Sequence, residues 1–180
     1  MTSGKLKGKM VRCLCIVMMG LMFAAVAPGP ADALSTLPKP SGKVILSVTG
    51  AIERTNVDGR ADLDRTMLES IGMVELETKT PFTKGSTVFR GILARDLLRH
   101  LGATGEQIEA AAIDLYKVNI PLEDFQRYDV LIALEADGKK LRVRDHGPAW
   151  VIYPWSQHEE LAKEIYSRRS IWQMNSIDVQ

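Results

Sequence analysis

Apolar and polar positions follow two different periods along residues 43–180, and each change of period predicts a new element. Residues 43–50, KVILSVTG, are rich in β-branched side chains and stop at a glycine, which predicts a strand. The same features predict a strand over residues 73–82 that enters a turn at Pro81, and a last strand over residues 171–179. Residues 129–145 hold two apolar runs around Asp137-Gly138, the clearest hairpin pattern in the chain.

Apolar residues at helical spacing predict three helices. The first covers residues 61–72, with a cap at Asp62 or Asp64, a stop at Gly72 and an apolar face of Leu63, Met67, Leu68 and Ile71. The second covers residues 89–103 and closes at Gly102, with a face of Leu93, Leu97, Leu98 and Leu101. The third covers residues 156–170, with Leu161 and Ile165 facing inward.

Two further segments complete the pattern. Residues 110–121 are ambiguous, but Lys117 to Ile120 favours a strand over a helix. After a Gly147-Pro148 turn, residues 149–155 form a short strand, in which Trp150 and Trp155 point to opposite faces. Strands and helices alternate irregularly and hairpins are present, so we expect one mixed α+β domain over residues 43–180.

The N-terminus has the pattern of a secretory signal peptide. Four basic residues precede the uncharged run from Cys13 to Ala27, and an A-x-A motif ends at Ala33. An uncleaved membrane anchor is the alternative, but Pro28 and Pro30 stop the apolar run short of the roughly 18 residues that a span requires. We therefore expect cleavage of residues 1–33, a flexible leader over residues 34–42 and a location in the periplasm.

Cleavage changes the composition in a way that excludes several classes of function. Both cysteines, Cys13 and Cys15, lie in the signal peptide, so disulfides, thiolate metal sites and a cysteine nucleophile are excluded from the domain. Loss of four basic residues and one acidic residue changes the formal net charge from +1 to −2, which gives no indication of nucleic-acid binding. The three histidines lie in unrelated patterns, and the HEELA segment has Ala162 where a zinc-protease helix needs histidine.

Aromatic residues gather near the C-terminus. Five of them fall in the last 31 residues, namely Trp150, Tyr153, Trp155, Tyr166 and Trp172, and Arg168 and Arg169 lie among them. Core packing explains some of this cluster. Flat ligands, however, are held between aromatic faces while a few polar groups bind the ring edge, so the cluster also predicts a binding site.

Three ordered stretches carry a family resemblance. TPFTKGSTVFRGILARDLLRHLGA, YKVNIPLEDFQRYDVLIALEADGKKLRVRDHGPAWVIYP and SIWQMNSIDV resemble the oxidoreductase molybdopterin-binding domain of the sulfite oxidase family. The resemblance implies the α+β sulfite oxidase fold and a pocket shaped for a pterin. It also implies a cysteine that ligates molybdenum, whereas this chain has Glu77 and Thr78 near that place. The family's Asn-Asp before the tyrosine is replaced by Asp114 and Leu115 before Tyr116.

Among such domains, the chain is most similar to metal-free periplasmic pterin-binding proteins. The resemblance implies a non-catalytic protein that binds a pterin, with molybdopterin among the candidates, and no metal. It also implies that the protein relays the status of the pterin to the periplasmic domain of an inner-membrane GGDEF/EAL enzyme of cyclic-di-GMP. We expect Trp172 and Trp150 to stack on the pterin and Phe82 and Tyr116 to line the pocket. Arg169, Arg90 and Asp145 are expected to bind its polar edge. Two alternatives stay open: a small molybdopterin-dependent oxidoreductase that lacks the cysteine metal ligand, and an interaction module with a vestigial pocket.

Overall fold

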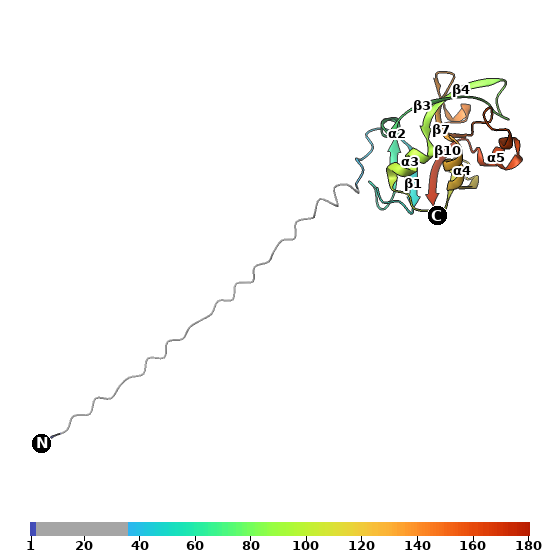
Figure 1. Cartoon of the computed structure of the whole chain (residues 1–180). Coiled ribbons are helices and arrows are strands. Elements are labelled where there is room, and N and C mark those ends of the chain that lie inside the picture. Colours follow the sequence, from blue (N-terminus) through green and yellow to red (C-terminus); the bar gives the residue numbers. More distant parts are fainter. Residues whose placement is uncertain (3–35) are drawn as a thin grey trace.

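The computed structural model describes residues 1–2 and 36–180, and the segment 36–180 forms two five-stranded sheets with a few short helices (Figure 1). The strands are β1 (Val44–Gly50), β2 (Ala61–Asp64), β3 (Val74–Lys79), β4 (Ser86–Leu93), β5 (Gln107–Ala112), β6 (Lys117–Pro121), β7 (Leu131–Ala136), β8 (Lys139–Lys140), β9 (Trp150–Ile152) and β10 (Met174–Val179). The α-helices are α2 (Arg65–Ile71), α3 (Ala94–Leu101), α4 (Leu122–Arg127) and α5 (Glu164–Arg169), and two 3₁₀ turns are η1 (Val143–Asp145) and η2 (Glu159–Ala162). The expected α+β class is confirmed.

The first sheet has the strand order β2-β1-β10-β5-β6, so the two ends of the domain lie side by side at its centre. β1 and β10 are parallel, and the other neighbours in this sheet are antiparallel. The second sheet has the order β3-β4-β7-β8, with β9 paired to β7. The C-terminal strand therefore joins the first sheet, while the Trp150 strand joins the second.

Two apolar clusters fill the domain, and β9 supplies side chains to both. Val151, with Tyr153 just after the strand, packs into the larger cluster, which also contains the apolar faces of α2 and α3. Trp150 and Ile152 pack into the smaller cluster with Phe89 of β4. The alternation predicted for residues 149–155 is thus confirmed.

Two of the predicted helices are shorter than expected because their first residues belong to strands. Residues 61–64 form β2, which pairs with β1, and α2 begins only after Asp64, whose side chain accepts a hydrogen bond from the Met67 amide. Residues 89–93 belong to β4, which pairs with β3 and β7. Tertiary pairing overrides the helical spacing here, since both segments are also compatible with period two. Gly72 and Gly102 end α2 and α3, as predicted.

The third predicted helix, residues 156–170, is wrong as a continuous element. It divides into η2 and α5 at Lys163, so Leu161 is buried but Ile165 is exposed rather than inward. The strand at Lys117 to Ile120 is confirmed as β6, whereas β5 and α4 were not predicted. The Asp137-Gly138 turn is confirmed by positive φ at both residues, but the returning strand is only the two residues of β8 and the chain then enters η1.

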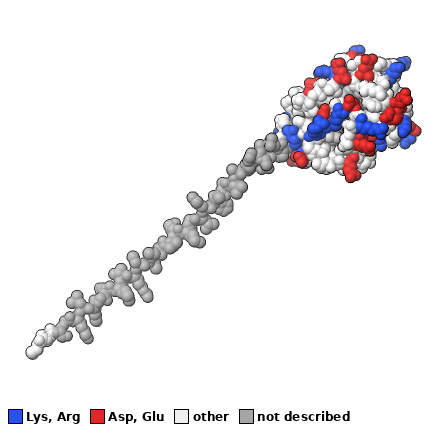
Figure 2. All heavy atoms as spheres, in the orientation of Figure 1, with Lys and Arg blue, Asp and Glu red and all other residues white. Residues whose placement is uncertain are grey.

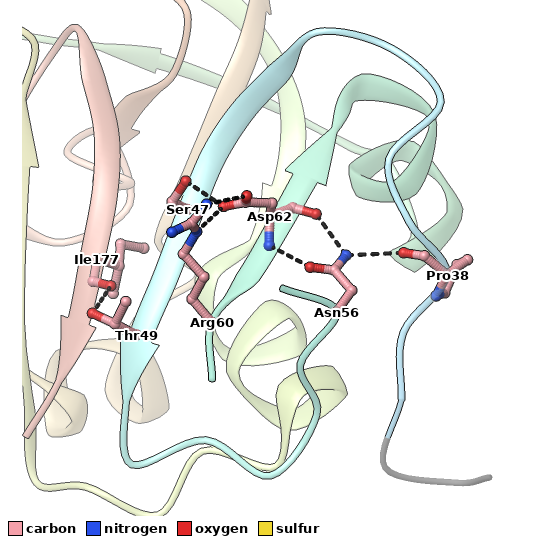
Figure 3. A network of polar contacts seen from close by, with 7 residues as sticks. All are labelled: Pro38, Ser47, Thr49, Asn56, Arg60, Asp62 and Ile177. Atoms are coloured by element: carbon pink, nitrogen blue, oxygen red, sulfur yellow. Dashed lines mark hydrogen bonds and ion pairs between the residues drawn. The ribbon is translucent and has the colours of Figure 1, made fainter. Parts of the chain in front are cut away.

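Residues 36–42, expected to belong to the leader, lie against the domain. The Leu37 side chain is buried and its amide donates to Thr55 O. The Asn56 side chain donates to Pro38 O and Asp62 O and accepts the amide of Asp62 (Figure 3). Asp62 in turn accepts from Arg60 and Ser47. The predicted signal peptide lies, apart from residues 1–2, outside the described residues. No helix within the described part of the chain has the length and apolar character needed to cross a membrane.

Candidate functional site

A cavity of about 400 Å³ opens between four segments of the domain. These segments are the β3–β4 loop, the β5–β6 turn, α5, and the link from α5 to β10. Its lining residues are Phe82, Ala112, Asp114, Tyr116, Glu164, Ser167, Arg168, Ser170, Ile171 and Trp172. The volume lies in the range of about 300–1,000 Å³ that small-molecule sites occupy.

Aromatic rings form one side of this cavity. Phe82 and Trp172 meet edge to face, with ring centroids 5.2 Å apart. The β3–β4 loop holds Phe82 there, because its amide donates to Thr80 Oγ1 over 3.1 Å and Thr80 is itself buried. Trp172 remains 40% exposed, so the cavity presents an aromatic face to solvent. Exposed aromatic faces of this kind can stack on a flat ring.

The β5–β6 turn forms another part of the wall and contributes Asp114 and Tyr116 to the lining. Tyr116 OH donates to the Arg168 carbonyl over 3.4 Å, which links the turn to α5. Leu115 at the tip adopts a left-handed backbone conformation, with φ 71°, and is 83% exposed. A bulky residue in this conformation is strained, and strain of this kind is concentrated at functional sites.

The charged residues of the cavity are two carboxylates and one guanidinium. Arg168 Nη2 donates to Glu164 Oε1 over 2.7 Å, an i,i+4 pair along α5. The Asp114 carboxylate accepts only the amide of Tyr116 among the described residues, over 3.1 Å, so it retains capacity to accept from a ligand. On the face of the domain that Figure 2 shows, acidic and basic side chains are interspersed.

Of the seven predicted site residues, the structure brings three to the cavity: Phe82, Tyr116 and Trp172. Trp150 is 2% exposed and packs against two of them, with its ring centroid 6.1 Å from that of Phe82 and 6.5 Å from that of Trp172. His146 covers another part of Trp150, stacked at 4.5 Å. Trp150 was expected to stack on the ligand, but packing on all sides makes it a support for the rings that line the cavity.

The three predicted polar residues lie elsewhere, each in an ion pair. Arg169 Nη1 donates to Asp124 Oδ2 over 2.9 Å, on the side of α5 away from the cavity lining. Asp145 accepts from Arg142 Nε over 2.7 Å, and this hydrogen bond lowers the pKa of the Asp145 carboxyl. Arg90 points from β4 toward Glu135 at 3.5 Å. We expected these three residues to bind the polar edge of the ligand, but none of them lines the cavity.

The polar residues that do line the cavity were not in the predicted set. Asp114 lies in a turn whose hydrogen bonds no sequence pattern indicated, and Glu164 lies one helical turn before Arg168. An i,i+4 acidic–basic pair beside aromatic residues was the signal available for Glu164 and Arg168. The third polar contribution, from Ser167 and Ser170, carried no distinctive signal.

The position expected for a metal-ligating cysteine is occupied by hydrogen-bonded side chains. Thr78 is fully buried, and its hydroxyl accepts the amide of Ser156 over 2.9 Å. Glu77 points to the exposed face of β3, where its carboxylate accepts from Ser86 over 2.9 Å. Within residues 1–2 and 36–180, no group of three or more His, Cys, Asp and Glu side chains is arranged to hold a metal ion.

Comparisons with known proteins agree with this architecture. A family model described as the oxidoreductase molybdopterin binding domain matches residues 61–168. Among solved structures, the sulfane dehydrogenase SoxCD from Paracoccus pantotrophus superposes with a TM-score of 0.54 at 15% sequence identity, over 76% of this chain and 38% of the SoxCD chain. At that identity the likeness concerns the fold, and this chain spans well under half of that chain's length. No curated protein sequence matches.

Proposed function

Because the chain belongs to the oxidoreductase molybdopterin binding domain family, we propose that it is a periplasmic, non-catalytic pterin-binding protein. The observation that carries the proposal is the cavity itself, which joins exposed aromatic faces to carboxylates. Trp172 and Phe82 supply the apolar side, and Asp114 and Glu164 supply acceptors. A pterin is flat and presents paired N–H donors along one edge, so it matches both features.

The proposed absence of a metal is supported by the chemistry beside β3. The neutral hydroxyl of Thr78 is buried and engaged, and no cysteine follows Cys15 in the sequence. A soft thiolate ligand for molybdenum is therefore lacking where the family resemblance expects one. The residues present fit the ring of a pterin better than a pterin that carries a metal centre.

Relay to a protein partner is supported by exposed apolar side chains on segments that line or adjoin the cavity. Ile113, Leu115 and Tyr116 on the β5–β6 turn are exposed, as are Trp172 and Val143. Backbone and side-chain bonds join these segments, since Ile113 N donates to Gln173 O and Gln173 Nε2 donates to Val143 O. An exposed apolar surface of this kind suits a protein partner, and we propose that the partner is the periplasmic domain of an inner-membrane GGDEF/EAL enzyme.

Analysis of the protein purified from the periplasm tests the proposal. Extraction and mass spectrometry are expected to find a pterin at near one per chain, with molybdenum far below one per chain. Apo protein is expected to bind tetrahydrobiopterin, kept reduced under nitrogen, with quenching of tryptophan fluorescence. An apo protein that neither carries nor binds a pterin would overturn the proposal.

One observation favours a second candidate, a small molybdopterin-dependent oxidoreductase without a cysteine ligand. It is the family match, which covers 61–168 and therefore most of the domain. In that case the cavity residues would hold the cofactor rather than a signal. Molybdenum at near one atom per chain in the native protein would favour this candidate over the first.

A further inference from the structure

Helix α5 forms a wall of the cavity, and its apolar packing on the described core comes from Tyr166, whose ring meets those of Tyr128 and Tyr153. Glu164, Ser167 and Arg168 line the cavity, and none of the six helical residues is buried. The helix also has no side-chain N-cap. A helix of this length is not stable alone, so its position must be fixed by contacts with the rest of the domain.

A buried polar tie on the other side of α5 provides such a contact. Arg169, the last residue of α5, donates through Nη1 to Asp124 Oδ2 over 2.9 Å. The same oxygen accepts from Tyr153 OH over 2.7 Å. Burial, followed by the charge of Asp124, raises the pKa of the Tyr153 hydroxyl, so it stays protonated and donates at any physiological pH. The tie thus joins α5 to α4 and to the segment after β9.

Stability alone does not account for this arrangement. The carboxylate of Asp124 and the guanidinium of Arg169 are both largely buried, with side-chain exposures of 10% and 18%. Among the described residues, Nε of Arg169 is buried without a hydrogen-bond partner. Burial of a charged pair with an unsatisfied donor is costly, and apolar side chains of similar volume would often stabilise the fold as well or better.

We infer that Arg169 is a positioning residue, which acts through Asp124 and Tyr153 to hold the α5 wall against the ligand. This inference rests on the proposed pterin-binding function. It assigns to Arg169 a role that requires no contact with the ligand, consistent with its absence from the lining while its neighbours Arg168 and Ser170 are present.

The test compares variants that lose one partner of the Arg169–Asp124–Tyr153 interaction with a variant in which all three polar groups are replaced. Arg169→Met leaves Asp124 buried without its cation, and we expect affinity for tetrahydrobiopterin to fall on the order of tenfold, with a lower Tm. Asp124→Asn should weaken binding in the same direction, although Asp124 does not line the cavity. The triple variant Arg169→Met/Asp124→Leu/Tyr153→Phe replaces all three polar groups by apolar ones, and both affinity and Tm should recover toward wild type.

The triple variant separates positioning from contact. If it regains the Tm but keeps the loss of affinity of Arg169→Met, Arg169 contacts the ligand and the inference is overturned. Should the triple variant fail to fold, Asp124→Asn decides: unchanged affinity in that variant also overturns the inference. Arg99→Met is the matched control, since Arg99 pairs with Asp96 on the surface of α3 and should change neither quantity.

Hydrogen–deuterium exchange keeps the test independent of the proposed function. We expect amide exchange over 164–169 to rise in Arg169→Met relative to the wild type and to return in the triple variant. If the wild-type protein binds no pterin, the proposed function fails, while exchange over α5 still judges the tie. Unchanged exchange over α5 in Arg169→Met would overturn the inference whether or not a pterin binds.

Discussion

Replacing Trp150 and Trp172 one at a time by alanine is expected to show that the first residue stabilises the fold and the second binds the ligand. Trp150 and Trp172 meet edge to face, with centroids 6.5 Å apart, but only Trp172 lines the cavity. Trp150→Ala should therefore act mainly on the free energy of unfolding. Trp172→Ala should act mainly on the affinity for a pterin.

The magnitudes follow from burial. Trp150 is 2% exposed, contacts Phe89 edge to face and donates through Nε1 to Ser170 O, so its loss should cost about 4 kcal/mol of stability. At roughly 2–4 °C per kcal/mol for a domain of this size, that corresponds to a fall in Tm of about 12 °C. Trp172 is already 40% exposed, so we expect about half that loss. Stacking on one ring is worth about 1–3 kcal/mol, which is about 5- to 150-fold in Kd.

Thermal and urea unfolding measure the first quantity, and titration with tetrahydrobiopterin at a temperature where each variant is folded measures the second. Trp155→Ala is the control, because Trp155 packs between the two apolar clusters and does not line the cavity. It should lose stability and keep its affinity. Unchanged affinity in folded Trp172→Ala would refute the assignment of this cavity as the pterin site.

Three other perturbations test the fold and the turn beside the cavity. Asp64→Ala removes the cap of α2 and the acceptor for the amides of Ser41 and Gly42, and should lower the free energy of unfolding by about 1–2 kcal/mol in urea at pH 7. Backbone hydrogen bonds, first that from Met67, lower the pKa of Asp64, so its contribution to the free energy of unfolding is present above about pH 4 and is lost as the pH falls further. In urea unfolding at a series of pH values, the free energy of unfolding of Asp64→Ala should therefore fall less steeply at acid pH than that of the wild type. Gly91→Ala should cost about 3 kcal/mol by thermal unfolding, because a Cβ there would lie 2.1 Å from the Ile132 carbonyl oxygen. Leu115→Gly should raise the free energy of unfolding by about 1 kcal/mol, since glycine tolerates φ 71°, while it weakens binding to the proposed partner in calorimetry.

The sequence predicted those elements whose local pattern agrees with their tertiary role. Gly102 ends α3 in a left-handed conformation, and the Asp137-Gly138 turn has the backbone that this residue pair favours. Residues 61–64 and 89–93 were assigned to helices because their apolar positions fit both periods. Pairing with other strands decides for a strand in both segments: β2 pairs with β1, and β4 pairs with β3 and with β7, which lies much further along the chain.

The residues of the candidate site also fall into a group that the sequence predicted and a group that it did not. Its aromatic lining could be predicted, since Phe82, Tyr116 and Trp172 belong to segments that carry the family resemblance. The polar residues could not, because a charged side chain is directed by the ion pair that it forms. Arg169 and Asp145 each lie within a few residues of a predicted aromatic residue in the sequence, yet their ion pairs with Asp124 and Arg142 direct them away from the cavity lining.

The charge that remains at the cavity has a consequence for the ligand. Two carboxylates, Asp114 and Glu164, line it with one guanidinium, Arg168, which Glu164 already pairs. An anionic group placed there would face the Asp114 carboxylate without a free cation in the lining to offset it, whereas ring N–H donors would satisfy that carboxylate. The cavity therefore favours the donor edge of a neutral ring, and a pterin without an added anionic group should bind more tightly than one that carries a phosphate.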